Sequence, residues 1–458
     1  MAVGNDALAP TAPMRNMITR LLEQYAPKGG LLRAALALGG ASLATQAVGV
    51  LLSPLYSRLY APADFGLFGV YTSILAAALT VGSLCYETGI PVGKDDAEAI
   101  GLTAISILLI LIIALGAVAW MGLETLAGSQ ASRSQLGGYL WLVPVGIVGA
   151  GVYRAIRYWA LRRNAMAAIA RTSISQLVGS NAMTLGFGVL YPRPLGLILG
   201  SIAGYSAGTW DLARRTQLIP LLRPDSASRV TSGQLWMIAK KYRRLPLMSA
   251  PSALFNSLGI YLPGILLAPY FGADFAGQFF MGMRVISLPV GLIGGVLSQV
   301  FFGSCAAVAR DRPQDLARFF NRVFVRAAAC SLVILLAGLA APWAFPVVFG
   351  KQWRPAGQIA VWLSLYCTVG LGVSALSSVP NIVGRLRGQF VIDVVRALAV
   401  LLLFVLGHRG GLSGMTLVKG YTAVMTAGYL AYLALYSHQV RVVARTGLTG
   451  WNEPTGAP

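Results

Sequence analysis

About twelve stretches of roughly twenty mostly apolar residues follow one another along the chain, and they restrict its fold more than any other feature. A segment of this length crosses a bilayer as a helix, in which every backbone N–H is bonded without water. A membrane β-barrel would show alternating segments of about ten residues instead. We therefore predict an all-α polytopic membrane protein. The expected spans lie near residues 34–56, 65–90, 99–122, 137–158, 168–190, 195–212, 246–269, 275–306, 323–346, 356–380, 388–407 and 412–436.

Charged residues are too scarce to cover a water-soluble globule, since they make up 11% of the 458 residues and an ordinary soluble domain contains about 25%. The net charge of +21 is distributed in short runs between apolar stretches, so we expect no nucleic-acid partner. The four cysteines all lie in apolar runs, and there are only two histidines. We therefore expect neither a disulfide nor a metal site.

Basic residues are alternately abundant and sparse in successive connecting segments. About 27 of the 36 lysines and arginines lie on the N-terminal side of the predicted membrane, and about six lie on the other side. The positive-inside rule then places both termini in the cytoplasm. We expect an N-terminal segment, an N-lobe of six spans, a basic cytoplasmic linker, a C-lobe of six spans and a tail, at 1–33, 34–212, 213–245, 246–437 and 438–458.

The two halves of the chain share a short motif, which predicts two pseudo-symmetric six-helix lobes around a central cavity. LYAPADFG at 59–66 joins spans one and two, and PYFGADFA at 269–276 joins spans seven and eight. Because each half has an even number of spans, the repeat is parallel, about an axis normal to the membrane. Asp64 and Asp274 are expected to cap the helices that follow them.

Three basic residues fall well inside predicted spans, where charge is costly and therefore points to function. Arg284 and Lys419 have no acidic neighbour at helical spacing, whereas Arg396 follows Asp393 by three positions and can pair with it on one helix face. An unpaired cation facing a water-filled cavity would attract an anion such as a pyrophosphate. The alternative for Arg284 and Lys419 is an ion pair across helices, for example with Glu87.

Four further charged residues near span ends are candidates with two interpretations each. Glu87, near the inner end of span two, either pairs with a basic residue across helices or titrates. Arg154 and Arg157 lie one turn apart beside aromatic residues, and either anchor span four at the interface or line a cytoplasmic vestibule. Arg58, at the outer end of span one, either lines the cavity or extends its guanidinium to the surface.

Signatures of catalysis and of cofactor binding are missing from the sequence. It has no P-loop, no G-x-S-x-G elbow, no H-E-x-x-H and no Gly-rich dinucleotide loop. The predicted outer loops are no longer than about 15 residues, which leaves little room for a membrane-embedded glycan enzyme. We therefore expect a chain that is not an enzyme and holds no cofactor.

Several segments resemble a known family. PLYSRLYAPADFGLF at 54–68, YETGI at 86–90, GKDDAEAI at 93–100, YWALRR at 158–163 and FGKQWRPAG at 349–357 look like the polysaccharide-biosynthesis flippases. These are Wzx-type members of the multidrug/oligosaccharidyl-lipid/polysaccharide (MOP) exporter superfamily. The resemblance implies two lobes in a V shape that flip an undecaprenyl-diphosphate-linked oligosaccharide to the outer leaflet of the bacterial cytoplasmic membrane by alternating access.

The resemblance further implies that basic cavity residues hold the diphosphate or acidic sugars, and it allows coupling to a proton or sodium gradient. Expected partners are the lipid bilayer, the lipid-linked glycan and glycan polymerase or assembly proteins. Alternatives within the superfamily are a drug/cation antiporter, which would favour acidic cavity residues, and a lipid II flippase, which more often has fourteen spans. Alternatives from another class are a membrane-embedded glycan-assembly enzyme and a scaffold.

Overall fold

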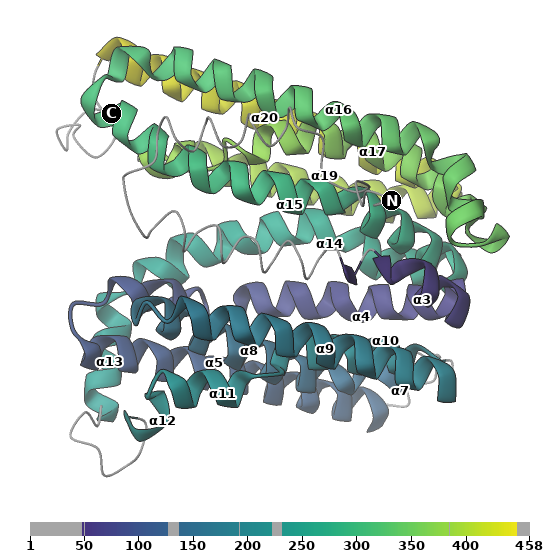
Figure 1. Cartoon of the computed structure of the whole chain (residues 1–458), viewed down its shortest axis with the longest axis horizontal. Coiled ribbons are helices and arrows are strands. Elements are labelled where there is room, and N and C mark those ends of the chain that lie inside the picture. The colour runs from purple at the N-terminus through teal and green to yellow at the C-terminus, as the bar shows by residue number, and fades with distance from the viewer. Residues whose placement is uncertain are drawn as a thin grey trace, which may run out of the picture.

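The computed structural model describes residues 48–49, 51–126, 137–191, 193–221, 231–383 and 385–446, and within this part of the chain the regular structure is entirely helical. The predicted N-terminal segment 1–33 and the end of the predicted tail, 447–458, lie outside the described residues. Two helical bundles lie side by side in Figure 1, one from each half of the chain. The prediction of an all-α polytopic protein with two lobes is confirmed.

The first lobe contains the helices of the N-terminal half. Its described helices are α3 (Ser53–Leu59), α4 (Pro62–Val81), η1 (Tyr86–Val92), α5 (Asp96–Leu126), α7 (Gly137–Leu140), α8 (Leu142–Arg162), α9 (Met166–Leu190), α10 (Pro194–Ser206), α11 (Thr209–Arg215) and α12 (Leu218–Leu221). Among these helices, α4, α5 and the α7–α8 segment are long and apolar enough to cross a membrane.

The second lobe follows the connecting helix α13 (Ser232–Lys241), which lies inside the predicted linker. Its helices are η2 (Leu245–Ser249), α14 (Ala250–Phe271), α15 (Ala273–Asp311), η3 (Pro313–Asp315), α16 (Leu316–Val348), η4 (Lys351–Trp353), α17 (Arg354–Ser374), α18 (Val379–Val383), α19 (Arg387–Arg409) and α20 (Gly414–Thr446). The segments containing α14, α16, α17 and α19 are long and apolar enough to cross a membrane. The C-terminal end of α20 lies at the same end of the bundle as α13 (Figure 1).

The second expected span ends earlier than its apolar sequence suggested. The helix α4 stops at Val81, because Leu84 and Cys85 adopt left-handed backbone angles with φ of 48° and 63°. A helix cannot continue through such residues. Glu87 therefore lies in the 3-10 helix η1 that follows, and not in the membrane-spanning helix itself.

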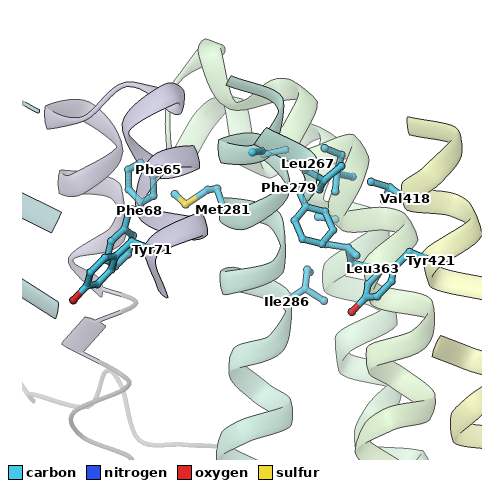
Figure 2. Packing of buried hydrophobic residues seen from close by; sticks show 14 of the residues in the cluster. Phe65, Phe68, Tyr71, Leu267, Phe279, Met281, Ile286, Leu363, Val418 and Tyr421 are labelled. Atoms are coloured by element: carbon cyan, nitrogen blue, oxygen red, sulfur yellow. The ribbon is translucent and has the colours of Figure 1, made fainter. Parts of the chain in front are cut away.

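A shared apolar core joins the two lobes along α4 and α15. Figure 2 shows Phe65, Phe68 and Tyr71 of α4 on one side and Met281 and other residues of the second lobe on the other. The rings of Phe68 and Phe280 meet edge to face, with centroids 5.5 Å apart. The seam is thus closed by aromatic packing, which is worth about 1 kcal/mol per ring pair beyond the area buried.

The two copies of the repeated motif cross each other at the start of α4 and α15. A Cβ built on Gly66 would lie 1.9 Å from the carbonyl oxygen of Ala273, and a Cβ on Gly277 would lie 1.8 Å from that of Pro62. Only glycine allows two backbones to approach this closely. Pro62 and Ala273 are the first residues of their helices, so the crossing is reciprocal.

The first turn of α4 is capped as predicted, since the Asp64 carboxylate accepts a hydrogen bond from the backbone N–H of Ala61 at 2.9 Å. Asp274 lies in the first turn of α15, where its charge favours the helix dipole.

The helix α13 packs against α5 and η1 of the first lobe. Lys241 forms an ion pair with Glu98 of α5, and this hydrogen bond raises the pKa of Lys241 above its usual value. Tyr242 donates to the same carboxylate at 3.0 Å, and Tyr86 donates to the carbonyl of Ala239 at 3.1 Å. The linker is therefore attached to the first lobe.

The two ends of the molecule are named here by the elements that lie there. The end that contains α13 is called the α13 end. The opposite end contains Ser57, Gly66, Gly277 and Trp353 and is called the Trp353 end.

Candidate functional site

A cavity of about 680 Å³ lies between the lobes. One wall comes from α3, α4, α9 and α10 of the first lobe, and the other from α14, α15, α17 and α20 of the second. The lining begins about half a turn beyond the helix crossing at the Trp353 end, with Phe68 two residues after Gly66 on α4 and Phe279 two residues after Gly277 on α15. The cavity therefore lies in the middle of the bundle, where a lipid-linked or amphipathic molecule could be enclosed between lobes.

Arg284 is the one formally charged side chain in the described lining of this cavity, and no carboxylate faces it there. It lies on the twelfth residue of α15, about 17 Å along the helix from its start. Measured along α15 from its start, this distance is about half the thickness of a hydrocarbon core of about 30 Å. Its guanidinium carbon lies 6.0 Å from the ring centroid of Tyr56, and no ion pair joins it to any described residue. An uncompensated cation inside the bundle calls for an anionic ligand.

A polar stripe on α9 forms much of the opposite wall. Gln176, Ser180 and Thr184 are spaced by four residues and lie on one face of the helix, with Asn181 beside them. The Asn181 side chain accepts a hydrogen bond from Tyr56 and donates to the carbonyl of Leu177. Asn181 thus orients the ring on which Arg284 rests.

Several hydroxyl groups in the wall make no hydrogen bond to the described part of the protein. They belong to Ser180, Ser201, Tyr205, Tyr261 and Ser287. Elsewhere in the bundle, hydroxyls such as those of Thr103 and Ser106 donate to the carbonyl four residues back. The five side chains of the wall are only partly buried, so their hydroxyls are available to water or a ligand in the cavity.

Two tyrosines of the second lobe line the cavity. Tyr366 of α17 and Tyr429 of α20 stack with centroids 6.4 Å apart and planes within 3°. The hydroxyl of Tyr366 lies 2.8 Å from the sulfur of Met283, one residue before Arg284. The tyrosine pair thus adds aromatic side chains to the cavity lining, and Tyr366 contacts the residue that precedes Arg284.

The predicted pair of Asp393 and Arg396 forms, but neither residue lines the cavity; Arg396 lies behind the lining residue Tyr429, 5.9 Å from its ring centroid. The charged groups of Asp393 and Arg396 are 3.3 Å apart and almost completely buried between α14, α19 and α20. Asp393 also accepts hydrogen bonds from Tyr432 and from Ser252. Arg396 donates to the side chain of Asn256 at 2.5 Å. These contacts describe a buried ionic network that joins three helices.

Glu87 pairs with Arg154 across helices, which is one of the two interpretations of its sequence position. The carboxylate of Glu87 is buried and lies 2.8 Å from the guanidinium, and it also accepts a hydrogen bond from Ser83. Arg154 also donates a hydrogen bond to the carbonyl of Leu79 at 3.1 Å. The pair ties α8 to η1, and the bond to Leu79 ties α8 to the end of α4, both outside the cavity lining.

Three other sequence candidates do not reach the cavity. Lys419 is exposed on α20, and its ammonium lies 4.8 Å from the ring centroid of the half-exposed Trp362. This cation–π contact places it on the outer surface of the second lobe. Arg157 and Arg58 are also exposed, the first on α8 and the second in the last turn of α3. Of the eight candidates, the structure brings only Arg284 into the described cavity lining.

The polar stripe on α9 and the cavity tyrosines were not predicted from the sequence. The stripe carried a signal, since Gln176, Ser180 and Thr184 recur with the helical period inside an otherwise apolar span. The tyrosines carried none, because tyrosine is equally common at membrane interfaces and in packed cores.

Within the described residues, no group of three His, Cys, Asp or Glu side chains could hold a metal ion.

Comparisons with known proteins agree with this arrangement. The model of a family described as "Polysaccharide biosynthesis protein" matches residues 55–358. Among curated proteins, none matches the chain. An inward-facing multidrug-resistance MATE transporter of the MOP superfamily is similar with a TM-score of 0.57 and 15% identity, over 93% of this chain and 98% of that one.

Two further solved structures inform the comparison. A MOP superfamily transporter from Pyrococcus furiosus, described as having a binding pocket of reverse polarity, is similar with a TM-score of 0.56 and 16% identity, over 93% of this chain and 98% of that one. An outward-facing MATE transporter of the same superfamily is similar with a TM-score of 0.50 and 16% identity, over the same shares of the two chains.

Proposed function

We propose an activity for this chain from the premise that it belongs to the polysaccharide biosynthesis protein family and is a multi-pass membrane transporter with the MOP-superfamily fold. The proposed activity is the flipping of an undecaprenyl-diphosphate-linked oligosaccharide. The proposed direction is from the inner to the outer leaflet of a bacterial cytoplasmic membrane. The α13 end, with its basic residues, would face the cytoplasm, as the positive-inside rule requires.

The observation that carries this proposal is the single guanidinium in the carboxylate-free lining of the cavity. A diphosphate diester has an ionised oxygen on each phosphate, and Arg binds such groups through two parallel hydrogen bonds. Arg284 lies inside the bundle between the two lobes, where the attraction between opposite charges is stronger than in bulk water. The cavity is thus suited to hold the head group of a lipid whose isoprenoid tail remains in the bilayer.

The proposed cycle exposes Arg284 alternately to the two sides of the membrane. In the structure the lobes meet at the Trp353 end, where Gln352 and Trp353 of the second lobe donate to the carbonyl of Ser57 of the first at 2.9 and 3.1 Å. The higher similarity to an inward-facing than to an outward-facing MATE transporter supports an inward-facing state. Flipping would then require these contacts to break while the lobes close at the α13 end.

The described cavity lining argues against the alternative of a drug/cation antiporter, since it contains no carboxylate to attract a cation. Glu87 and Asp393 are both ion-paired outside it. A glycan-assembly enzyme would need titratable groups beside the substrate, and the described lining has none besides Arg284, tyrosines and Cys367. A proton or sodium gradient remains the proposed energy source, with no cofactor.

The experiment that tests the proposal is export of the lipid-linked glycan in cells that carry Arg284→Gln or Arg284→Lys in place of the wild-type chain. At equal amounts of protein in the membrane, we expect Arg284→Gln to lower surface glycan at least about tenfold, since a charge-assisted hydrogen bond is worth about 1.5–3 kcal/mol. Arg284→Lys should retain part of the export because it keeps the charge but loses the bidentate geometry.

Arg326→Gln is the matched control, because Arg326 is an exposed arginine on α16, outside the cavity lining. It should export glycan like the wild type. Equal export by Arg284→Gln and Arg326→Gln would remove Arg284 from the proposed binding site.

A further inference from the structure

The charged group of the cavity and its uncharged hydrogen-bonding groups lie on opposite walls. Arg284 supplies one positive charge on the α15 side. The facing wall, formed by the α9 stripe together with Ser201 and Tyr205 of α10, supplies hydroxyl and amide groups without any charge. We call this wall the α9–α10 face, defined by Gln176, Ser180, Thr184, Ser201 and Tyr205.

This arrangement leads to an assignment that rests on the proposed function. We infer that the transported oligosaccharide is electrically neutral, without uronic acid, sialic acid or phosphate substituents, and that its sugars bind the α9–α10 face while Arg284 holds the diphosphate.

The charge balance is the first argument. One guanidinium offsets only part of the charge of a diphosphate, so no cation is left in the described lining for an acidic sugar. A carboxylate on the glycan would enter a low-dielectric cavity without a partner and beside a like charge.

The free hydrogen-bonding groups are the second argument. The hydroxyls of Ser180, Ser201 and Tyr205 have no partner among the described residues. Gln176 donates its amide N–H to the carbonyl of Tyr205 at 3.3 Å, which leaves its side-chain oxygen as an acceptor. Uncharged donors and acceptors of this kind match the hydroxyl groups of neutral sugars, which both donate and accept.

The aromatic surfaces are the third argument. Tyr205 and Tyr261 come from opposite lobes and line the same cavity, and the stacked Tyr366–Tyr429 pair lines it from the second lobe. Tyrosine rings pack against the C–H faces of sugars, and the tyrosine hydroxyl groups form hydrogen bonds with the sugar. Such contacts discriminate by shape and are indifferent to charge, so they add affinity for a neutral glycan.

The test compares two undecaprenyl-diphosphate-linked oligosaccharides that differ at one sugar, a hexose in one and the corresponding hexuronic acid in the other. The full-length protein is reconstituted in vesicles, and flipping is measured as the rate at which the glycan becomes accessible to a membrane-impermeant glycosidase. We expect the neutral substrate to be flipped at least about tenfold faster, the size of effect that an unpaired charge produces.

Two lysine variants make the comparison specific. Ser201→Lys adds a cation to the α9–α10 face and should bring the rates for the two substrates closer together. Ser175→Lys adds the same charge to the exposed side of α9, outside the cavity lining, and should keep the wild-type ratio.

Equal rates for the two substrates, or a preference for the acidic one, would overturn the assignment of a neutral glycan and leave the proposed flippase function standing. Flipping of neither substrate by an intact, inserted protein would overturn the proposed function, and the glycan assignment with it.

Discussion

The indole N–H of Trp353 donates a hydrogen bond of 3.1 Å to the main-chain carbonyl of Ser57, and so joins the second lobe to the first. Gln352 donates to the same carbonyl at 2.9 Å, and Ser57 in turn donates its hydroxyl to the carbonyl of Phe349 at 3.1 Å. The motif FGKQWRPAG is thus a clasp between lobes at the Trp353 end. In the proposed cycle this clasp breaks each time the cavity opens outward.

Replacing Trp353 with Phe should weaken this clasp without emptying its site, since a phenyl ring can still pack against Phe65, whose ring centroid lies 5.1 Å away. The lost hydrogen bond is worth about 1 kcal/mol, or roughly a fivefold shift between closed and open states. The measurement is labelling of a cysteine introduced at Thr72 in the cavity by an impermeant thiol reagent added outside, in a chain with Cys367→Ala. Trp353→Phe should speed labelling about fivefold.

The control for this prediction is Trp120→Phe, because Trp120 is exposed at the end of α5 and takes no part in the clasp. It should leave the labelling rate unchanged. A rate for Trp353→Phe that matches this control would show that the clasp does not limit outward opening.

Gly66→Ala should disturb the helix crossing at the Trp353 end, because the added methyl would meet the backbone of Ala273 at 1.9 Å. Backbone atoms cannot turn aside as a side chain can, so α4 and α15 must move apart. We expect normal membrane insertion, a lower melting temperature in detergent and loss of flipping. Thermal unfolding and the vesicle assay measure the two effects.

Gly186→Ala provides the comparison, since nothing lies within 4 Å of a Cβ at Gly186 on α9. Alanine favours helix formation by about 1 kcal/mol over glycine, so this variant should be as stable as the wild type or more stable. If both variants lose stability equally, the close approach of α4 and α15 is not what Gly66 provides.

Asp393→Asn should destabilise the second lobe strongly, because it leaves the buried guanidinium of Arg396 without its counter-charge. Breaking a buried pair in this way costs about 3–5 kcal/mol. The double variant Asp393→Asn with Arg396→Gln removes both charges and should recover part of that loss. Unfolding of purified protein, monitored by circular dichroism, gives the values; a double variant no more stable than Asp393→Asn would argue against a charge-based role.

The sequence was sufficient for the fold because the determining property is local. Each span is visible as an apolar run, and the motifs around Asp64 and Asp274 revealed the repeat. What the repeat does required coordinates, since the crossing of Gly66 with Gly277 joins backbones about two hundred residues apart.

The candidate site was only partly predictable, as Arg284 and Lys419 illustrate. Both are lone cations between apolar residues, and the helical period does not tell whether a face meets lipid, a cavity or another helix. Coordinates separate them, because Arg284 lines the cavity and Lys419 rests on Trp362 at the outer surface. The hydrogen bond between Tyr56 and Asn181 spans 125 positions and has no local signal.

Binding of a short-chain polyprenyl diphosphate to the purified protein tests the central claim most directly. With Arg284 as the diphosphate ligand, the Kd should rise at least about tenfold in Arg284→Gln, rise less in Arg284→Lys and stay unchanged in Arg326→Gln. The corresponding polyprenol, which lacks phosphate, should bind all four proteins alike. The same Kd for the diphosphate in wild type and Arg284→Gln would contradict the account.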